Sequence, residues 1–296
     1  MRKVLGTLVL GICLAGLAMP AAAGAGKPYK PYYLSLGDSL AAGVQPGPDG
    51  TARNTRQGFA HQLARRVGNV RLVNYGCGWA TTGSFIDASR PCLPTRKPGY
   101  RNSSPKTSQL AAAERFLRRH RTRVAFVTVD IGANDVAACA PGGQIDLECV
   151  TRGVAAIKAN APKIARRLRA AAGPKTPMAV MTLYNPFLAS WFDGPGGKFV
   201  AKVSQDLARD QVNAVLVKAF RGHGFKIADV AKRMHTYDPF PIDGESTGTP
   251  PLPVREICRL TWMCAPAPRG PDIHANKAGY GLIAATFRKA LGKAAR

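Results

Sequence analysis

The feature that most constrains the fold is an alternation between short apolar runs and helical patterns along almost the whole chain. Five runs rich in β-branched or apolar residues have the length of buried strands, at residues 32–36, 70–74, 124–129, 178–183 and 225–228. Helical patterns alternate with them, at residues 57–67, 108–120, 151–172, 199–221 and 276–291. This alternation predicts an α/β domain with a mostly parallel sheet covered by helices on both faces.

Three connections in this pattern are long and rich in Gly and Pro. They cover residues 83–105, 184–197 and 234–271. Because each follows a predicted strand, we expect the three loops at the carboxyl edge of the sheet, where open α/β sheets bind ligands. Long loops in compact domains are often functional.

The first 25 residues have the pattern of a secretory signal peptide. Arg2 and Lys3 precede an apolar stretch at residues 4–17, and small residues follow. A membrane anchor is the alternative, but the stretch is shorter than the roughly 20 apolar residues of a membrane-spanning helix. No second long apolar run occurs, so we predict a mature domain over residues 26–296 without a membrane span, exported from the cell or bound to its wall.

Cysteine usage agrees with export. Without Cys13, six cysteines remain, and an even number in an exported chain indicates disulfides. Close spacing favours three local pairs, namely Cys77–Cys92, Cys139–Cys149 and Cys258–Cys264. A metal site is the alternative, but the chain lacks a Cys-x-x-Cys pair with a histidine at finger-like spacing.

The charge of the chain is strongly positive. Its 42 Lys and Arg residues against 17 Asp and Glu residues give a net charge of +25. Such a field attracts anionic surfaces such as acidic lipids, wall polymers or nucleic acid. The basic residues are spread over predicted helices and no nucleic-acid-binding motif accompanies them, so a solvated basic surface without a specific nucleic-acid partner is the simpler interpretation.

The first predicted strand ends in a Gly-Asp-Ser-Leu run at residues 37–40. Gly37 permits a tight turn, and Ser39 at the end of the strand can present its hydroxyl group to the loop-lined cleft. A serine is a weak nucleophile until a base removes its proton. Alone, this run is a common turn, and it differs from the Gly-x-Ser-x-Gly elbow of the α/β-hydrolases.

Among the five histidines, His274 is the best candidate for that base. It stands just before the last predicted helix, two residues after Asp272 in an extended segment, so the two side chains can share a side. A carboxylate that holds one imidazole nitrogen sets the tautomer and stabilises the imidazolium. The alternative is that Asp272 merely caps the last helix.

A third polar turn follows the predicted strand at residues 124–129. It reads Gly-Ala-Asn-Asp at residues 132–135. Asn134 could aim its amide group at an oxyanion, a role for which Asn side chains are suited. By itself the run is a turn signal.

Together, these three segments resemble the SGNH (GDSL) hydrolase family, and in particular its secreted actinobacterial lipase and esterase members. The matching blocks are residues 37–40, 132–135 and 272–274, in the family's order and spread over nearly the whole mature chain. The last block departs from the family's usual Asp-x-x-His spacing, because Ile273 alone separates the two residues. The resemblance implies a three-layer α/β/α fold with five parallel strands in flavodoxin-like order.

The resemblance also implies the chemistry. Ser39 would attack an ester carbonyl, His274 would take its proton, and Asp272 would be the acid of the triad. The Ser39 N–H group and the Asn134 amide would hold the oxyanion, and neither a metal nor an organic cofactor is needed.

A third oxyanion donor would come from the segment after the second strand, residues 74–82. Secreted members of the family have a Gly five residues after the Asn of this block, where this chain has Trp79, with Gly78 just before it. The backbone N–H group of either residue is a candidate. The indole of Trp79 could instead narrow the acyl pocket.

The leading functional hypothesis is a secreted carboxylic ester hydrolase for lipid or aryl esters. Aromatic residues on the predicted loops could line its acyl site, namely Phe187, Trp191, Phe192, Tyr237, Phe240 and Trp262. A carbohydrate O-acetylesterase or a phospholipase is the alternative within the family. A non-catalytic basic protein that binds anionic wall polymers or lipid head groups is the alternative outside it.

Overall fold

The computed structural model describes residues 1, 29–90, 92, 108–140, 144–241 and 249–296. The predicted signal peptide, apart from Met1, lies outside these residues.

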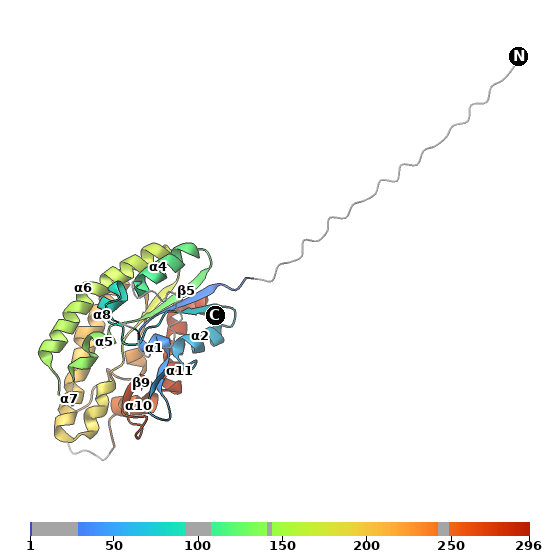
Figure 1. Ribbon diagram of the computed structural model, residues 1–296. Helices are drawn as coiled ribbons and strands as arrows, with labels where there is room; N and C mark the ends of the chain where they lie inside the picture. The colour runs from blue at the N-terminus through green and yellow to red at the C-terminus, as the bar shows by residue number, and fades with distance from the viewer. Residues whose placement is uncertain (2–28, 91, 93–107, 141–143, 242–248) are drawn as a thin grey trace.

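A five-stranded parallel sheet forms the centre of the molecule (Figure 1). Its strands are β1 (Tyr32–Gly37), β4 (Arg71–Asn74), β5 (Val124–Asp130), β6 (Met178–Met181) and β7 (Lys226–Ala228). They are arranged in the order β4-β1-β5-β6-β7, and all four neighbouring pairs are parallel. This confirms the five predicted strands and the flavodoxin-like order.

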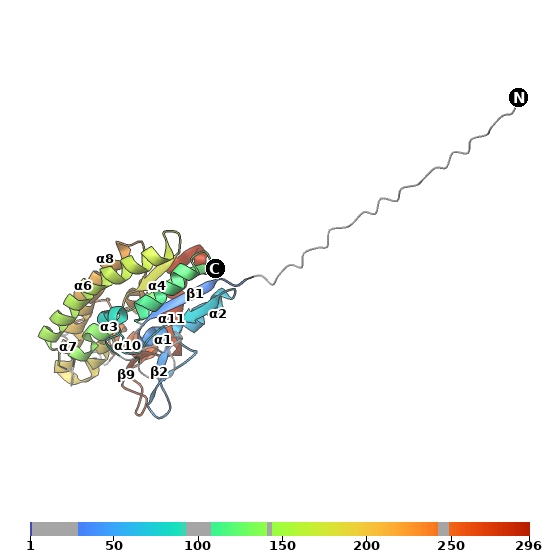
Figure 2. The same ribbon diagram turned by 45° about the horizontal axis from the view of Figure 1, so that its top comes forward.

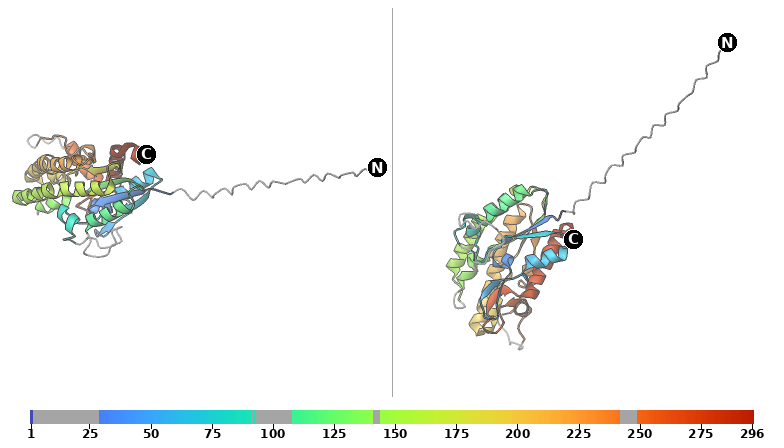
Figure 3. Two further views of the ribbon diagram at one scale, coloured as in Figure 1. Left: turned by 90° about the horizontal axis from the view of Figure 1, so that it is seen from above. Right: turned by 45° about the vertical axis from the view of Figure 1, so that its right-hand side comes forward.

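Helices cover both faces of this sheet, as expected for the three-layer fold. On one side lie α4 (Gln109–Arg119), α6 (Leu147–Ala172) and α8 (Ala214–Arg221), and on the other lie α2 (Phe59–Val67) and α11 (Lys277–Leu291) (Figures 2 and 3). The stacked rings of Phe59 and Phe287, 5.1 Å apart, join α2 to α11. Arg167 on α6 donates two hydrogen bonds to Glu114 on α4, at 2.8 and 2.7 Å.

The predicted long loops contain secondary structure of their own. The first holds part of α3 (Thr82–Asp87), the second η3 (Pro186–Phe192) and the start of α7 (Gly194–Asp206), and the third α10 (Leu252–Leu260) and β8 (Thr261–Trp262). The predicted helix at 199–221 is three segments, because a π-helical stretch, η4 (Leu207–Asn213), joins α7 to α8. These short elements lack the long periodicity by which a sequence identifies a helix.

The remaining elements are short. They are α1 (Ser39–Ala42), β2 (Val44–Pro46), β3 (Ala52–Asn54), α5 (Ala133–Val136), η1 (Ala137–Cys139), α9 (Val230–Arg233), β9 (Asp272–Ala275) and η5 (Gly292–Ala295).

The three predicted disulfides are present. They join Cys77 to Cys92, Cys139 to Cys149 and Cys258 to Cys264. Across the ranges that the structure describes, none of the helices combines the length and the apolar character needed to cross a membrane.

Candidate active site

Ser39, Asn134 and His274 line one pocket at the carboxyl edge of the sheet. Ser39 is the first residue of α1, directly after β1, and Asn134 lies in α5, directly after β5. Strands β1 and β5 are neighbours from which the chain continues to opposite sides of the sheet. This is the topological switch point at which α/β sheets of this kind bind ligands.

The pocket has an empty volume of about 950 Å³, its open mouth included. Most of its wall is apolar. The apolar side chains come from α1, from the segment that runs from α5 into α6, from the end of β6, and from η3, η4 and β9. They include Leu40, Val136, Ala137, Ile145, Val150, Leu183, Phe187, Leu207, Ala208, Val212 and Ile273. Such a surface suits a hydrocarbon group, with a few polar groups at one end to orient it.

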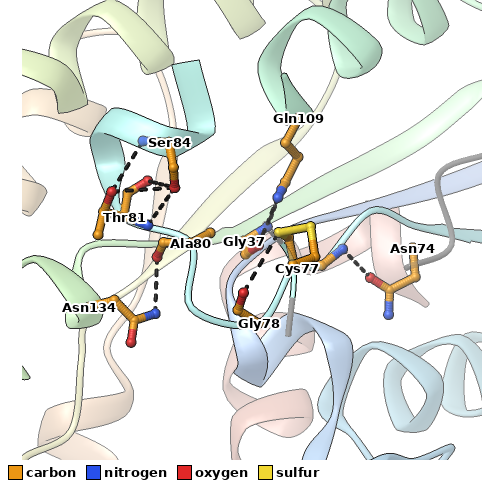
Figure 4. Close-up of a disulfide and its surroundings, with 11 residues drawn as sticks. Gly37, Asn74, Cys77, Gly78, Ala80, Thr81, Ser84, Gln109 and Asn134 are labelled. Atoms are coloured by element: carbon orange, nitrogen blue, oxygen red, sulfur yellow. Dashed lines mark hydrogen bonds between the residues drawn. A yellow bond between two sulfur atoms is a disulfide. The ribbon is translucent and has the colours of Figure 1, made fainter. Parts of the chain in front are cut away.

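The turn that carries Ser39 is held by its neighbours. Gly37 has a φ of 140°, in the region that favours glycine. The side-chain amide of Gln109 clamps its backbone, accepting from the Gly37 N–H group at 2.7 Å and donating to the Gly37 carbonyl at 2.9 Å (Figure 4). Asp38 caps α1, because its Oδ1 accepts from the Leu40 N–H group at 2.9 Å. The predicted tight turn is therefore present, and Ser39 follows it.

His274 and Asp272 lie in β9 and share a hydrogen bond. The Nδ1 atom of His274 is 2.8 Å from Oδ1 of Asp272. Burial raises the pKa of Asp272, but the hydrogen bonds and charge of His274 outweigh this effect and hold it below its usual value. The hydroxyl group of Tyr184 donates to the carbonyl of Ile273 at 2.8 Å and anchors this segment.

Ser39 and His274 face the same pocket, but no hydrogen bond joins their side chains among the described residues. Catalytic hydrogen bonds are often long in unliganded enzymes and tighten only with substrate. The predicted nucleophile and base are therefore together in space, with Asp272 behind the imidazole.

Asn134 is tied to the loop that follows β4. Its Nδ2 donates to the Ala80 carbonyl at 3.0 Å (Figure 4). The second hydrogen of the amide has no partner among the described residues. The neighbouring Asp135 accepts from the N–H and hydroxyl groups of Thr82, at 2.9 and 2.6 Å. Burial raises the pKa of Asp135 more than these two bonds lower it. Both residues therefore join the run at residues 132–135 to the segment at residues 74–82.

The candidate oxyanion donors Gly78 and Trp79 stand together in a turn, closed by a 3.1 Å hydrogen bond from the Ala80 N–H group to the Cys77 carbonyl. Trp79 has a φ of 65°, a conformation that favours glycine. Its side chain is 56 % exposed and does not line the pocket, so the expectation that the indole narrows the acyl pocket is not met. Neither residue is part of the pocket wall, although Ala80 brings the turn to Asn134.

Of the six aromatic residues predicted on the loops, Phe187 lines the pocket and the other five do not. The ring of Trp191 packs edge-on against Phe240, with centroids 5.5 Å apart. Trp262 donates to the side chain of Gln45 at 3.3 Å. Among the described residues, His, Cys, Asp and Glu side chains nowhere gather in groups of three or more that could hold a metal ion.

Four residues around the site are not among the predicted site residues. They are Gln109, Asp130, Asp135 and Tyr184, which contact the segments that carry those residues. Asp135 has a sequence signal, because it belongs to the Gly-Ala-Asn-Asp run at residues 132–135. The others act through contacts distant in sequence, such as the one between Gly37 and Gln109, which are 72 positions apart.

Similarity to known proteins agrees with this geometry. The chain matches the GDSL-like lipase/acylhydrolase family over residues 35–282. No curated protein matches the sequence significantly.

Among solved structures, the chain is similar to a phospholipase A1 from Streptomyces albidoflavus NA297, with a TM-score of 0.53 and 18 % identity over 88 % of this chain and 100 % of that one. It is also similar to a carbohydrate acetylesterase family member from Sinorhizobium meliloti, with a TM-score of 0.42 and 14 % identity over 88 % of this chain and 99 % of that one. At 18 % identity, the similarity to the phospholipase A1 structure describes the fold alone. The family match covers most of the chain, and the chain therefore belongs to the GDSL-like lipase/acylhydrolase family and is a serine ester hydrolase.

Proposed function

We propose that the protein hydrolyses carboxylic esters with an apolar acyl chain, with Ser39 as nucleophile and His274 as general base. The observation that carries this proposal is one pocket in which Ser39, Asn134 and His274 stand beside an apolar wall. These three residues come from segments far apart in the sequence.

In the proposed reaction, His274 accepts the proton of the Ser39 hydroxyl group while the oxygen attacks the ester carbonyl. The oxyanion accepts hydrogen bonds from the Ser39 N–H group, from the Asn134 amide, and from the N–H group of Gly78 or Trp79. When the tetrahedral intermediate collapses, His274 gives its proton to the departing alcohol. An ester of Ser39 remains.

Water completes the cycle. His274 takes a proton from a water molecule that attacks the Ser39 ester, and returns it to Ser39 as the free acid leaves. Asp272 orients the imidazole and stabilises the imidazolium in both steps.

The apolar wall supports a lipid-like acyl group over a sugar acetate. An acetyl group would contact only a small part of this apolar wall, and a sugar would find few polar partners on the apolar residues. A phospholipase is the second candidate, since the net charge of +25 favours substrates with anionic head groups.

The same proposal includes export, with residues 1–25 as the signal peptide and residues 26–296 as the enzyme. The charged, apolar and small-residue order of the first 25 residues supports it. Three disulfides are also typical of exported proteins.

The test is a series of p-nitrophenyl esters from acetyl to palmitoyl. The native enzyme should prefer the longer acyl groups, and Ser39→Ala or His274→Ala should lower kcat by about 10⁶-fold, as for the equivalent residues of a known serine hydrolase. Ser89→Ala and His223→Ala are matched controls away from the pocket and should retain full activity. Absence of hydrolysis across the whole series would refute the proposal.

A further inference from the structure

Two buried carboxyl groups lie behind Ser39. Asp38 precedes Ser39 and is 1 % exposed, while Asp130 ends β5 and is fully buried. Asp130 is the register partner of Gly37, the last residue of β1. The proposed mechanism uses neither carboxyl group.

The side chain of Asp130 fills the space beside Gly37. A Cβ atom at position 37 would lie 2.0 Å from both the carbonyl oxygen and Oδ1 of Asp130. Position 37 therefore requires glycine for two reasons: the turn needs its backbone conformation, and the side chain of Asp130 leaves no room for a Cβ atom. Asp130 is therefore built into the support of the nucleophile.

The hydrogen bonds of the two carboxyl groups are incomplete if both are ionised. Oδ1 of Asp38 accepts from Leu40, but Oδ2 of Asp38 has no donor among the described residues. The backbone N–H groups of Asp38 and Ala41 approach the carboxyl group of Asp130, but neither of its oxygens has a donor there at regular hydrogen-bond geometry. The polar group that acts most strongly on each carboxyl group is the other one, within hydrogen-bonding range. Buried polar atoms without partners are costly, and two like charges in contact cannot both be maintained in such a site.

One proton shared by the two carboxyl groups would remove the repulsion between like charges and supply a donor for an unpartnered oxygen. Burial and the neighbouring charge of Asp38 raise the pKa of Asp130 well above its ordinary value. Burial raises the pKa of Asp38 as well, but the Leu40 N–H group and the charge of His274 favour its ionised form. The proton therefore belongs on Asp130, whose hydroxyl group can then donate to Oδ2 of Asp38.

We propose that a protonated Asp130 is a positioning residue, which donates a hydrogen bond to Asp38 and so fixes the first turn of α1 that presents Ser39. The inference rests on the proposed role of Ser39 as nucleophile. Asp38 then has one donor on each oxygen, Leu40 from its own helix and Asp130 from the neighbouring strand. The bond joins the ends of β1 and β5, between which the pocket lies.

The test compares Asp130→Asn with Asp130→Leu. Both variants keep the branched shape of the side chain, but only asparagine can donate to Asp38. The readouts are the rate at which a fluorophosphonate labels Ser39, and kcat and KM for a soluble short-chain ester. Asp130→Asn should label almost as fast as the native chain. Asp130→Leu should lose about 100-fold in labelling rate and in kcat, the size expected for a displaced reacting group, with little change in KM.

Thr128→Val is the matched control on the same strand. It removes a different buried hydrogen bond, the 2.8 Å contact between the hydroxyl groups of Thr128 and Tyr33, so it should lower stability and leave the labelling rate unchanged. Thermal unfolding of each variant identifies any that does not fold.

Infrared spectroscopy tests the proton directly. The native protein at neutral pH should show the carbonyl stretch of a protonated carboxylic acid, and Asp130→Asn should lack it. Equal labelling of folded Asp130→Leu and Asp130→Asn, or absence of that band, would overturn the inference. Failure of the proposed function is a separate result, since the native chain itself would then not be labelled.

Discussion

Asp272 and His274 are joined twice through one carboxylate oxygen. Oδ1 of Asp272 accepts from the imidazole Nδ1 at 2.8 Å and from the backbone N–H group of His274 at 2.9 Å. The second bond turns the Asp272 side chain toward the backbone of His274, two residues further along the chain. This chain thus reaches the carboxylate–imidazole contact although the usual Asp-x-x-His spacing is shortened by one residue. Asn276, and not Asp272, caps α11.

We predict that Asp272→Asn lowers kcat for p-nitrophenyl esters by about 10⁴-fold, because an amide no longer stabilises the imidazolium or sets its tautomer. The KM should change little. A loss of only a few-fold in a folded variant would mean that another group supports His274.

The lowered pKa of Asp272 also predicts a pH dependence of stability. A carboxyl group with a folded-state pKa below its ordinary 3.8 contributes stability above that value, which is lost as the pH falls through the folded-state pKa. As the pH falls below about 4, the melting temperature of the native chain should therefore decrease more steeply than that of Asp272→Asn. Parallel acid profiles of the two proteins would contradict this expectation.

Removing the amide of Asn134 should cost about 100- to 1,000-fold in kcat, the usual effect of losing one oxyanion donor. The same change removes the hydrogen bond to Ala80, so the free energy of unfolding of Asn134→Ala should be lower by about 1 kcal/mol. Steady-state kinetics and chemical denaturation separate the two effects. If kcat is unchanged while stability falls, Asn134 has only the anchoring role.

The left-handed backbone at Trp79 predicts that glycine is more stable than alanine at this position. Trp79→Gly should be more stable than Trp79→Ala by about 1 kcal/mol, because both lose the indole and only glycine adopts this conformation freely. Both variants retain the backbone N–H group, so both should remain active. Denaturant unfolding gives the comparison, and an alanine variant as stable as the glycine variant would show that the turn is not strained.

A bulky residue in the acyl pocket should change the preferred chain length. Ala208 lines the pocket from η4, and Ala208→Phe should lower the ratio of kcat/KM for palmitoyl to that for acetyl esters by about 100-fold. Ala159→Phe on an exposed part of α6 is the control and should leave the ratio unchanged. An unchanged ratio in Ala208→Phe would place the acyl chain elsewhere.

The five strands, most of the long helices and the three disulfides were predictable from the sequence. Each depends on a pattern within a short stretch of chain, such as an apolar run, an amphipathic period or a close pair of cysteines. The six aromatic residues on the loops show the limit of such patterns. Phe187 and Trp191 are both aromatic and both lie in η3. Only Phe187 lines the pocket, because Trp191 packs against Phe240 instead.

The sequence by itself determined which residues are candidates, because the Gly-Asp-Ser and Gly-Ala-Asn-Asp runs follow predictable strands and the Asp-Ile-His run precedes a predictable helix. Only the tertiary structure decided what supports them. Asp130 reaches Gly37 and Asp38 through the parallel register of β5 and β1, and Gln109 reaches Gly37 from another layer. Such contacts depend on how distant segments pack against each other, and no local pattern of residues encodes that arrangement.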